Sequence, residues 1–130
     1  ASRAIVAPSS GAAGSIGVII MHTDMSAALD QEGIKVTLVT AGTHKADGNP
    51  YEALSPEVLA RLQASVDTDR EAFAAFVGKA RGARFTKAKA LATEAKVYSA
   101  DEAKALGLID EVARPSEAFH KFTRAVNQAN

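Results

Sequence analysis

Lys45 is the residue of this sequence whose position most favours chemistry. It follows an apolar run at 34–40 that is typical of a β-strand. In open parallel sheets, ligands and reacting groups gather where the strands end. A lysine acts as a general base only if its pKa falls from about 10.4 to roughly 7–8, which requires a site that excludes water. Apolar strands on either side of Lys45 would provide such a site, and a solvated loop lysine is the simpler interpretation.

The three histidines do not form a metal-binding pattern. His22, His44 and His120 fall on three different predicted elements, with no His-x-x-x-His pair and no cysteine partner. We therefore expect no metal site and assign these side chains a structural hydrogen-bonding role. His22 and His44 both end strand segments, which would make them near neighbours.

Three glycines at 11, 14 and 17 invite a comparison with nucleotide-binding loops. Their spacing is G-x-x-G-x-x-G and leads into a predicted strand, whereas the dinucleotide fingerprint reads G-x-G-x-x-G and opens a helix. The Gly-Lys-Ser/Thr of a phosphate loop is absent from the sequence. The pattern predicts a turn or a close backbone approach, and we expect no cofactor.

Composition limits the classes of function. Fifteen Lys and Arg balance fifteen Asp and Glu, so the basic surplus of a nucleic-acid-binding domain is missing. No apolar run approaches the ~20 residues that a membrane-spanning helix needs, and no targeting signal is recognisable. The absence of cysteine fits a reducing compartment or a protein that needs no disulfides. A length of 130 residues predicts one domain.

Apolar runs predict four strands, at 4–7, 16–21, 34–40 and 108–112. Asp24 is placed to cap a helix over 25–32 that Gly33 ends, so the second and third strands would form a parallel pair with a helical crossover. The fold class is therefore α/β, with a short, mostly parallel sheet followed by helices.

Three capping patterns and one alanine-rich segment predict the helices of the C-terminal two thirds. Ser55 precedes a long helix to about residue 82, a shorter helix spans 86–94, a capping box starts at Ser99, and Ser116 caps the last helix. Two apolar faces are expected to point inward. The long helix would use Val58, Leu62, Val66, Phe73 and Val77, and the last helix would use Phe119, Phe122 and Val126.

Two segments resemble a known family of enzymes. Gly14-Ser15-Ile16-Gly17-Val18 and Ala41-Gly42-Thr43-His44-Lys45 are similar to motifs of the signal peptide peptidase A family, serine peptidases with a Ser–Lys dyad on a Clp-protease-like, crotonase-related fold. The resemblance implies that Lys45 is the general base. It also implies that Ser15 supports Lys45 by a hydrogen bond, so the Ser15 hydroxyl should lie within hydrogen-bonding reach of the Lys45 amine.

The resemblance is closest to the capsid (prohead) proteases of bacteriophages and runs from about residue 2 to about residue 120. The runs 21–26 and 45–52 carry it. The chain departs from the family at Ala41, where Ser is frequent, and at Thr43, where Ala is common. The family's nucleophilic serine lies upstream of a strand like 4–7. We therefore expect residues 1–130 to be the C-terminal portion of a single peptidase domain whose nucleophile-bearing part is missing upstream.

The resemblance implies an endopeptidase that processes phage scaffold or coat proteins, with a protein substrate and no cofactor. The 130 residues alone are expected to be inactive. They are expected to associate with further copies or with the missing N-terminal part, in the bacterial cytoplasm or a phage procapsid. Two rival interpretations stay open: a crotonase-like acyl-CoA enzyme, which needs no Ser15–Lys45 pair, and a non-enzymatic assembly or scaffold fragment.

Overall fold

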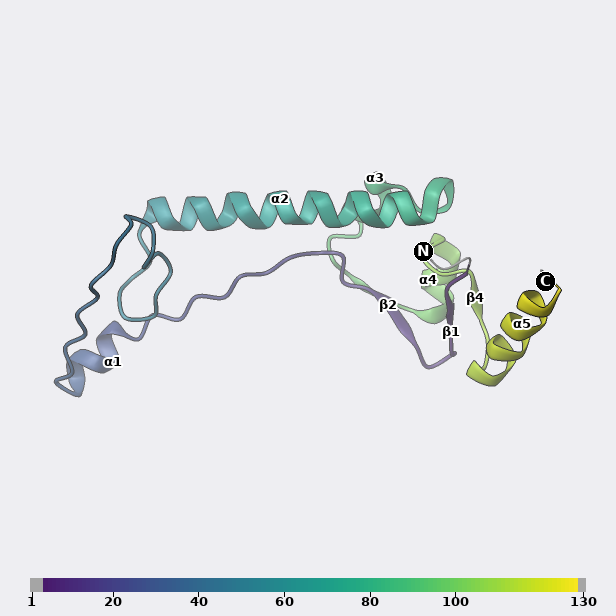
Figure 1. Cartoon of the computed structure of the whole chain (residues 1–130), viewed down its shortest axis with the longest axis horizontal. Coiled ribbons are helices and arrows are strands. Elements are labelled where there is room, and N and C mark those ends of the chain that lie inside the picture. Colours follow the sequence, from purple (N-terminus) through teal and green to yellow (C-terminus); the bar gives the residue numbers. More distant parts are fainter. Residues whose placement is uncertain (1–3, 129–130) are drawn as a thin grey trace. The chain divides into compact units, whose positions relative to one another are not determined.

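The computed structural model describes residues 4–128; residues 1–3 and 129–130, the ends of the predicted 1–130 domain, lie outside it. The chain divides into a first unit, residues 4–17 and 70–128, and a second unit, residues 18–69. Figure 1 shows the helices and strands of each unit. No helix of residues 4–128 is both long and apolar enough to cross a membrane.

Two small sheets form the β-structure of the first unit. Strand β1 (Val6–Ala7) pairs in parallel with β4 (Glu111–Val112), and β2 (Ala12–Gly14) pairs antiparallel with β3 (Val97–Ser99). The predicted α/β class with parallel strands is confirmed, although one of the two pairs is antiparallel. No sequence pattern predicted β2 and β3. The predicted 108–112 strand is shorter than expected, because the N–H groups of Leu108 and Ile109 donate to the Ala103 carbonyl oxygen of the preceding helix.

The helices begin and end close to the capping signals. Helix α1 spans Ser26–Gln31, α2 Pro56–Arg81, α3 Lys87–Ala92, α4 Ala100–Leu106 and α5 Pro115–Asn127, and a 3₁₀ turn covers Gly82–Arg84. Ser99 and Glu102 form the predicted capping box of α4, and Gly107 ends that helix in the left-handed conformation. Ser116 does not cap α5: Arg114 occupies the cap position and Pro115 is the first helical residue.

Small residues let the elements of the first unit approach closely. Its buried core contains Ile16, Ala74, Phe85, Ala90, Ala100, Ala103, Leu108 and Ile109. A Cβ atom on Gly78 of α2 would lie 2.4 Å from the Lys87 nitrogen, and one on Gly14 would lie 2.2 Å from the Lys96 carbonyl oxygen. The close backbone approach predicted for the glycine series is therefore confirmed at Gly14.

The predicted strands at 16–21 and 34–40 are not formed. Ile16 is buried in the core of the first unit, and the remaining residues of both runs have no strand partner among the described residues. The parallel pair predicted across α1 is therefore wrong for this chain. The 12 residues from 22 to 33 that separate the two runs would just suffice for a crossover between parallel strands, so the length of the connection does not account for the absence of the pair.

Two predicted helix faces also differ from the structure. On α2, Ala74 is fully buried and Phe73 is exposed, so the inward face turns by one residue near its middle. On α5, Phe119 and Phe122 are 64% and 63% exposed and Val126 is exposed as well, contrary to the prediction. Helix α5 packs on β1, and its half-buried residues include the small Ala118 and Thr123.

A buried ion pair joins three segments of the first unit. The Arg81 guanidinium donates to both carboxylate oxygens of Asp110, at 2.8 and 2.9 Å, and to the Gly107 carbonyl oxygen. The Asp110 carboxylate also accepts the Ile5 N–H at 2.7 Å and a hydrogen bond from Arg84. The hydrogen bonds from Arg81 hold the pKa of Asp110 far below its usual range. The end of α2 is thereby tied to the residue that precedes β1.

Replacing Arg81 by Met should lower the free energy of unfolding by roughly 3 kcal/mol at pH 7, because it leaves the Asp110 carboxylate without its main partner. The folded-state pKa of Asp110 is lowered, so the stabilisation is complete above the unfolded value of about 3.9 and is lost as the pH falls below it. Urea unfolding of both proteins at pH 7 and pH 3 should show a smaller difference at pH 3.

Glu71→Gln is the matched control, since it removes a half-exposed ion pair with Lys87 and should change stability by less than about 0.5 kcal/mol. An Arg81→Met protein whose loss of stability is the same at both pH values would contradict the ion-pair account.

Candidate active site

Ser15 lies in the first unit, directly after β2. Its backbone takes a positive φ of 57°, which is uncommon for a residue other than glycine. The conformation is fixed from both sides, because its N–H donates to the Lys96 carbonyl oxygen at 3.0 Å and its own carbonyl oxygen accepts the Gly17 N–H at 2.9 Å. The residue is exposed. The strand β2 and the segment before β3 thus set the position of the Ser15 side chain.

Lys45 lies in the second unit, within a series of turns that covers 41–49. Its N–H donates to the Gly42 carbonyl oxygen at 3.1 Å, and Gly42 has a φ of 107° that favours glycine. Every residue from 31 to 45 is exposed. The predicted place of Lys45 at the end of a strand is not reproduced, because residues 34–40 form no strand, and the flanking apolar strands that would keep its amine dry are not formed among residues 4–128.

An ionic chain anchors the turn that carries Lys45. Asp47 accepts a hydrogen bond from the His44 ring at 3.1 Å and pairs with Arg61 of α2. Arg61 also binds Glu57 one helical turn away, at 2.7 Å. The hydrogen bond to Asp47 raises the pKa of Arg61, so this guanidinium stays charged. The ionic chain thereby links His44 and Asp47, which flank Lys45 and Ala46, to the first turns of α2.

Asn49 closes the same turn. Its side-chain amide donates to the Ala46 carbonyl oxygen at 2.8 Å and to Glu52 at 2.6 Å, while its amide oxygen accepts the Tyr51 N–H at 2.9 Å. The Asn49 backbone carbonyl accepts a hydrogen bond from the His22 ring at 2.9 Å. The sequence analysis took 47–50 for an ordinary turn; the Asx pattern at Asn49 was the available signal for its anchoring role.

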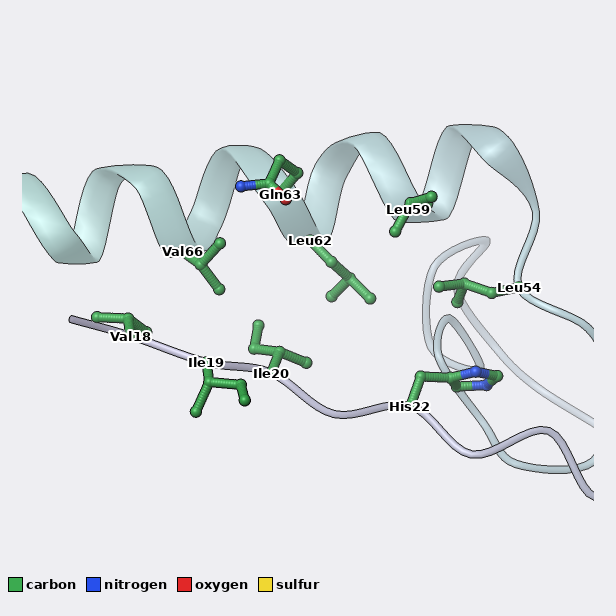
Figure 2. Close-up of a pocket in the computed structure, with 9 residues that line it drawn as sticks. All are labelled: Val18, Ile19, Ile20, His22, Leu54, Leu59, Leu62, Gln63 and Val66. Atoms are coloured by element: carbon green, nitrogen blue, oxygen red, sulfur yellow. The ribbon is translucent and has the colours of Figure 1, made fainter. Parts of the chain in front are cut away.

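His22 and residues 18–20 border an apolar pocket of about 340 Å³ in the second unit. Figure 2 shows Ile20 directed towards α2 and Ile19 directed away from it. On the other side the pocket is lined by Leu54, Leu59, Leu62, Gln63 and Val66. The three predicted inward positions at the start of α2 are half-buried, but no sequence pattern indicated a pocket there.

Ser15 and Lys45 belong to different units of the chain, so a hydrogen bond between their side chains stays a prediction. Within residues 4–128, no group of three or more His, Cys, Asp or Glu side chains has the arrangement of a metal site. The best-defined polar contacts of the second unit are the hydrogen bonds and ion pairs of Asp47 and Asn49, which hold the turn that carries Lys45.

Comparison with known proteins places this geometry in a family. The sequence model of Peptidase family S49 matches residues 1–129. The chain belongs to peptidase family S49. This S49 chain carries both motifs on which the resemblance to Ser–Lys peptidases rests, at 14–18 and 41–45, and the match extends beyond them to nearly its whole length.

Phage proteins are among the relatives of this S49 chain. It is 42% identical over 106 residues to the capsid assembly protease C of Escherichia phage lambda, and 36% identical over 114 residues to the head-tail preconnector protein GP5 of Enterobacteria phage P21. These matches cover 82% and 88% of this chain but only 24% and 22% of the relatives. The chain thus spans about a quarter of their length.

A putative protease of Methanocaldococcus jannaschii is 30% identical over 126 residues, which cover 97% of this chain and 40% of that protein. Relatives outside phages therefore share nearly the whole of this S49 segment. The predicted resemblance to the family, and to its phage branch, is confirmed.

Replacing Asn49 by Ala should loosen the turn that follows Lys45. Amide hydrogen exchange at Tyr51 is expected to become about fivefold faster, because one intramolecular hydrogen bond contributes roughly 1 kcal/mol. Asn49→Asp keeps the oxygen that accepts the Tyr51 N–H and should preserve its protection. If both variants exchange at the rate of the original chain, Asn49 does not anchor this turn.

Proposed function

We propose that this chain is the general-base portion of a serine endopeptidase that processes the proteins of a phage prohead. The observation that carries the proposal is the S49 match over residues 1–129, together with 42% identity to a protein named as a capsid assembly protease. Its substrates would be scaffold, portal or coat proteins, and its place of action a procapsid or the host cytoplasm.

Lys45 is the proposed general base. Its neutral amine takes the proton of the nucleophilic serine as that oxygen attacks a peptide carbonyl, and the resulting ammonium then protonates the leaving amine. A lysine side chain has four rotatable bonds, so a hydrogen bond from the amine to the Ser15 hydroxyl would fix its direction. Two observations support these roles of Lys45 as the base and Ser15 as the group that directs it. The backbone of Ser15 is held by hydrogen bonds on both sides, and the turn of Lys45 is anchored by Asn49 and Asp47.

The proposal requires a further part of the protein. No residue of this chain matches the family's nucleophile, so we expect the 130 residues alone to hydrolyse no peptide. Desolvation favours the neutral form of an amine, and Lys45 is exposed in this chain. The nucleophile-bearing part would therefore both supply the serine and cover Lys45.

The two rival interpretations receive different support. No feature of residues 4–128 favours a crotonase-like acyl-CoA enzyme over an S49 peptidase. A non-enzymatic role in head assembly draws on the name of the phage P21 relative, a head-tail preconnector protein. That alternative predicts that an intact Lys45 is unnecessary for the function of the complete protein.

In the complete protein, Lys45→Ala should lower kcat for peptide hydrolysis by roughly 10²–10⁴-fold or more, because it removes the general base. Ser15→Ala should lower kcat less, since it removes only the group that directs the amine. Unfolding midpoints should change little, because neither side chain belongs to the hydrophobic core of the described residues. Steady-state kinetics on a scaffold-derived peptide, with the 130-residue chain as the inactive baseline, measures these effects.

Lys35→Ala is the matched control: it removes another exposed lysine of the second unit and should leave kcat unchanged. A folded Lys45→Ala protein with full activity would show that Lys45 is an ordinary loop lysine.

A further inference from the structure

The strained backbone of the first unit is gathered around Ser15. Among residues 4–128, the residues other than glycine with a positive φ are Ser15 at 57°, Glu94 at 47° and Ala95 at 56°. Side chains rarely adopt this left-handed conformation, because the Cβ atom comes too close to the following carbonyl oxygen. Residues held in it cluster at functional sites. The three residues meet at one point, since the Ser15 N–H donates to the carbonyl oxygen of Lys96, which follows Ala95.

The left-handed turn at 94–95 leads from α3 into β3 and is held from the helical side. Lys96 N–H donates to the carbonyl oxygen of the buried Thr93 at 3.0 Å. The Glu94 carboxylate pairs at 2.9 Å with Arg70 of α2, whose guanidinium also donates to a carbonyl oxygen of α3 at 2.9 Å. These contacts set the position of the Lys96 carbonyl oxygen that receives the Ser15 N–H.

The residues on either side of Ser15 leave its backbone little freedom to adjust. Gly14 has a φ of 143°, and a Cβ atom there would collide with the Lys96 carbonyl oxygen. Ile16 is buried in the core. Gly17 closes a three-residue turn by donating to the Ser15 carbonyl oxygen at 2.9 Å. A displacement of the left-handed turn would therefore displace the Ser15 hydroxyl as well.

Gly17 lies directly against the left-handed turn. A Cβ atom on Gly17 would lie 2.7 Å from the Ala95 Cβ but 4.0 Å from the Ala95 Cα. Carbon atoms in van der Waals contact are about 3.5–4.0 Å apart, so a methyl group at position 17 would force the two segments roughly 1 Å apart. Gly17 is not among the glycines with a positive φ. The space beside the Ala95 methyl group, rather than the backbone conformation, therefore requires a glycine there.

We infer that Ala95 is a positioning residue for the Ser15 hydroxyl. Its methyl group sets how closely Gly17 approaches, and the next carbonyl oxygen along the chain holds the Ser15 N–H. The inference rests on the proposed function, because the left-handed turn acts on catalysis only through the pair of Ser15 and Lys45. It extends the candidate site to a segment far along the sequence that belongs to neither motif.

A compensating pair of substitutions in the complete protein tests the inference. Gly17→Ala should lower kcat for hydrolysis of a scaffold-derived peptide by roughly tenfold or more with little change in KM, since a displacement of about 1 Å at an active site costs up to roughly 10²-fold. Adding Ala95→Gly removes the opposing methyl group and should restore most of the lost activity. Glu94→Gly is the matched control: it relieves the same strain at the neighbouring residue, leaves the Ala95 methyl group in place and should restore none.

Two further measurements separate positioning from a general loss of stability. In a Ser15→Ala protein, Gly17→Ala should lower kcat no further, because the hydroxyl that it displaces is already absent, whereas a structural defect would add to the loss. Amide hydrogen exchange at Ser15, whose N–H donates to Lys96, should become faster in Gly17→Ala and slow again when Ala95→Gly is added. The exchange rate is measurable whether or not a variant is active.

Several outcomes would overturn the inference while the proposed function stands, with Lys45→Ala inactive. They are full activity of Gly17→Ala, equal rescue by Ala95→Gly and Glu94→Gly, a further loss of kcat in the Ser15→Ala protein, and a loss of folding in Gly17→Ala that Ala95→Gly does not repair. A fully active Lys45→Ala protein would instead remove the proposed function, and the role of Ala95 would fall with it.

Discussion

The buried pair between Arg81 and Asp110 is the interaction on which the first unit depends. Arg81 ends the long helix α2, and Asp110 precedes the short strand β4 and accepts the N–H of Ile5. One carboxylate therefore fixes where β1 meets β4, although each strand contains only two residues. Such short strands have little stability of their own. The ion pair sets the register between β1 and β4, which in longer strands would be set by the hydrogen bonds between them.

The second unit is held differently. It has hydrogen bonds and ion pairs around Asp47 and Asn49 but no buried residue. These contacts organise the turn that carries Lys45, whereas the extended segments before that turn have no backbone partners within the described chain. The residue proposed for catalysis thus lies on a locally ordered turn. Its wider surroundings, in our proposal, come from the nucleophile-bearing part of the protein.

Local signals in the sequence predicted most of the helices. Ser55, Thr86 and the Ser99–Glu102 box marked helix starts correctly, because capping depends on a few neighbouring atoms. Strand pairing was not predictable in the same way, since it needs partners distant in sequence: 34–40 reads as a strand but finds none, while Ala12–Gly14 pairs with Val97–Ser99 without a clear pattern. For the candidate site, the motif resemblance pointed to Lys45 and Ser15, but not to the residues that anchor the turn, Asp47, Asn49 and Arg61. Their roles depend on contacts that only the folded turn creates.

The central claim is that Lys45 and Ser15 act together in one active site. The distance between Ser15 Oγ and Lys45 Nζ in a crystal structure of the complete protein, including its nucleophile, tests it most directly. Our account predicts a separation of about 2.7–3.2 Å, the range of a hydrogen bond. An ordered 41–50 turn with the two atoms more than about 6 Å apart, well beyond hydrogen-bonding range, would contradict the claim.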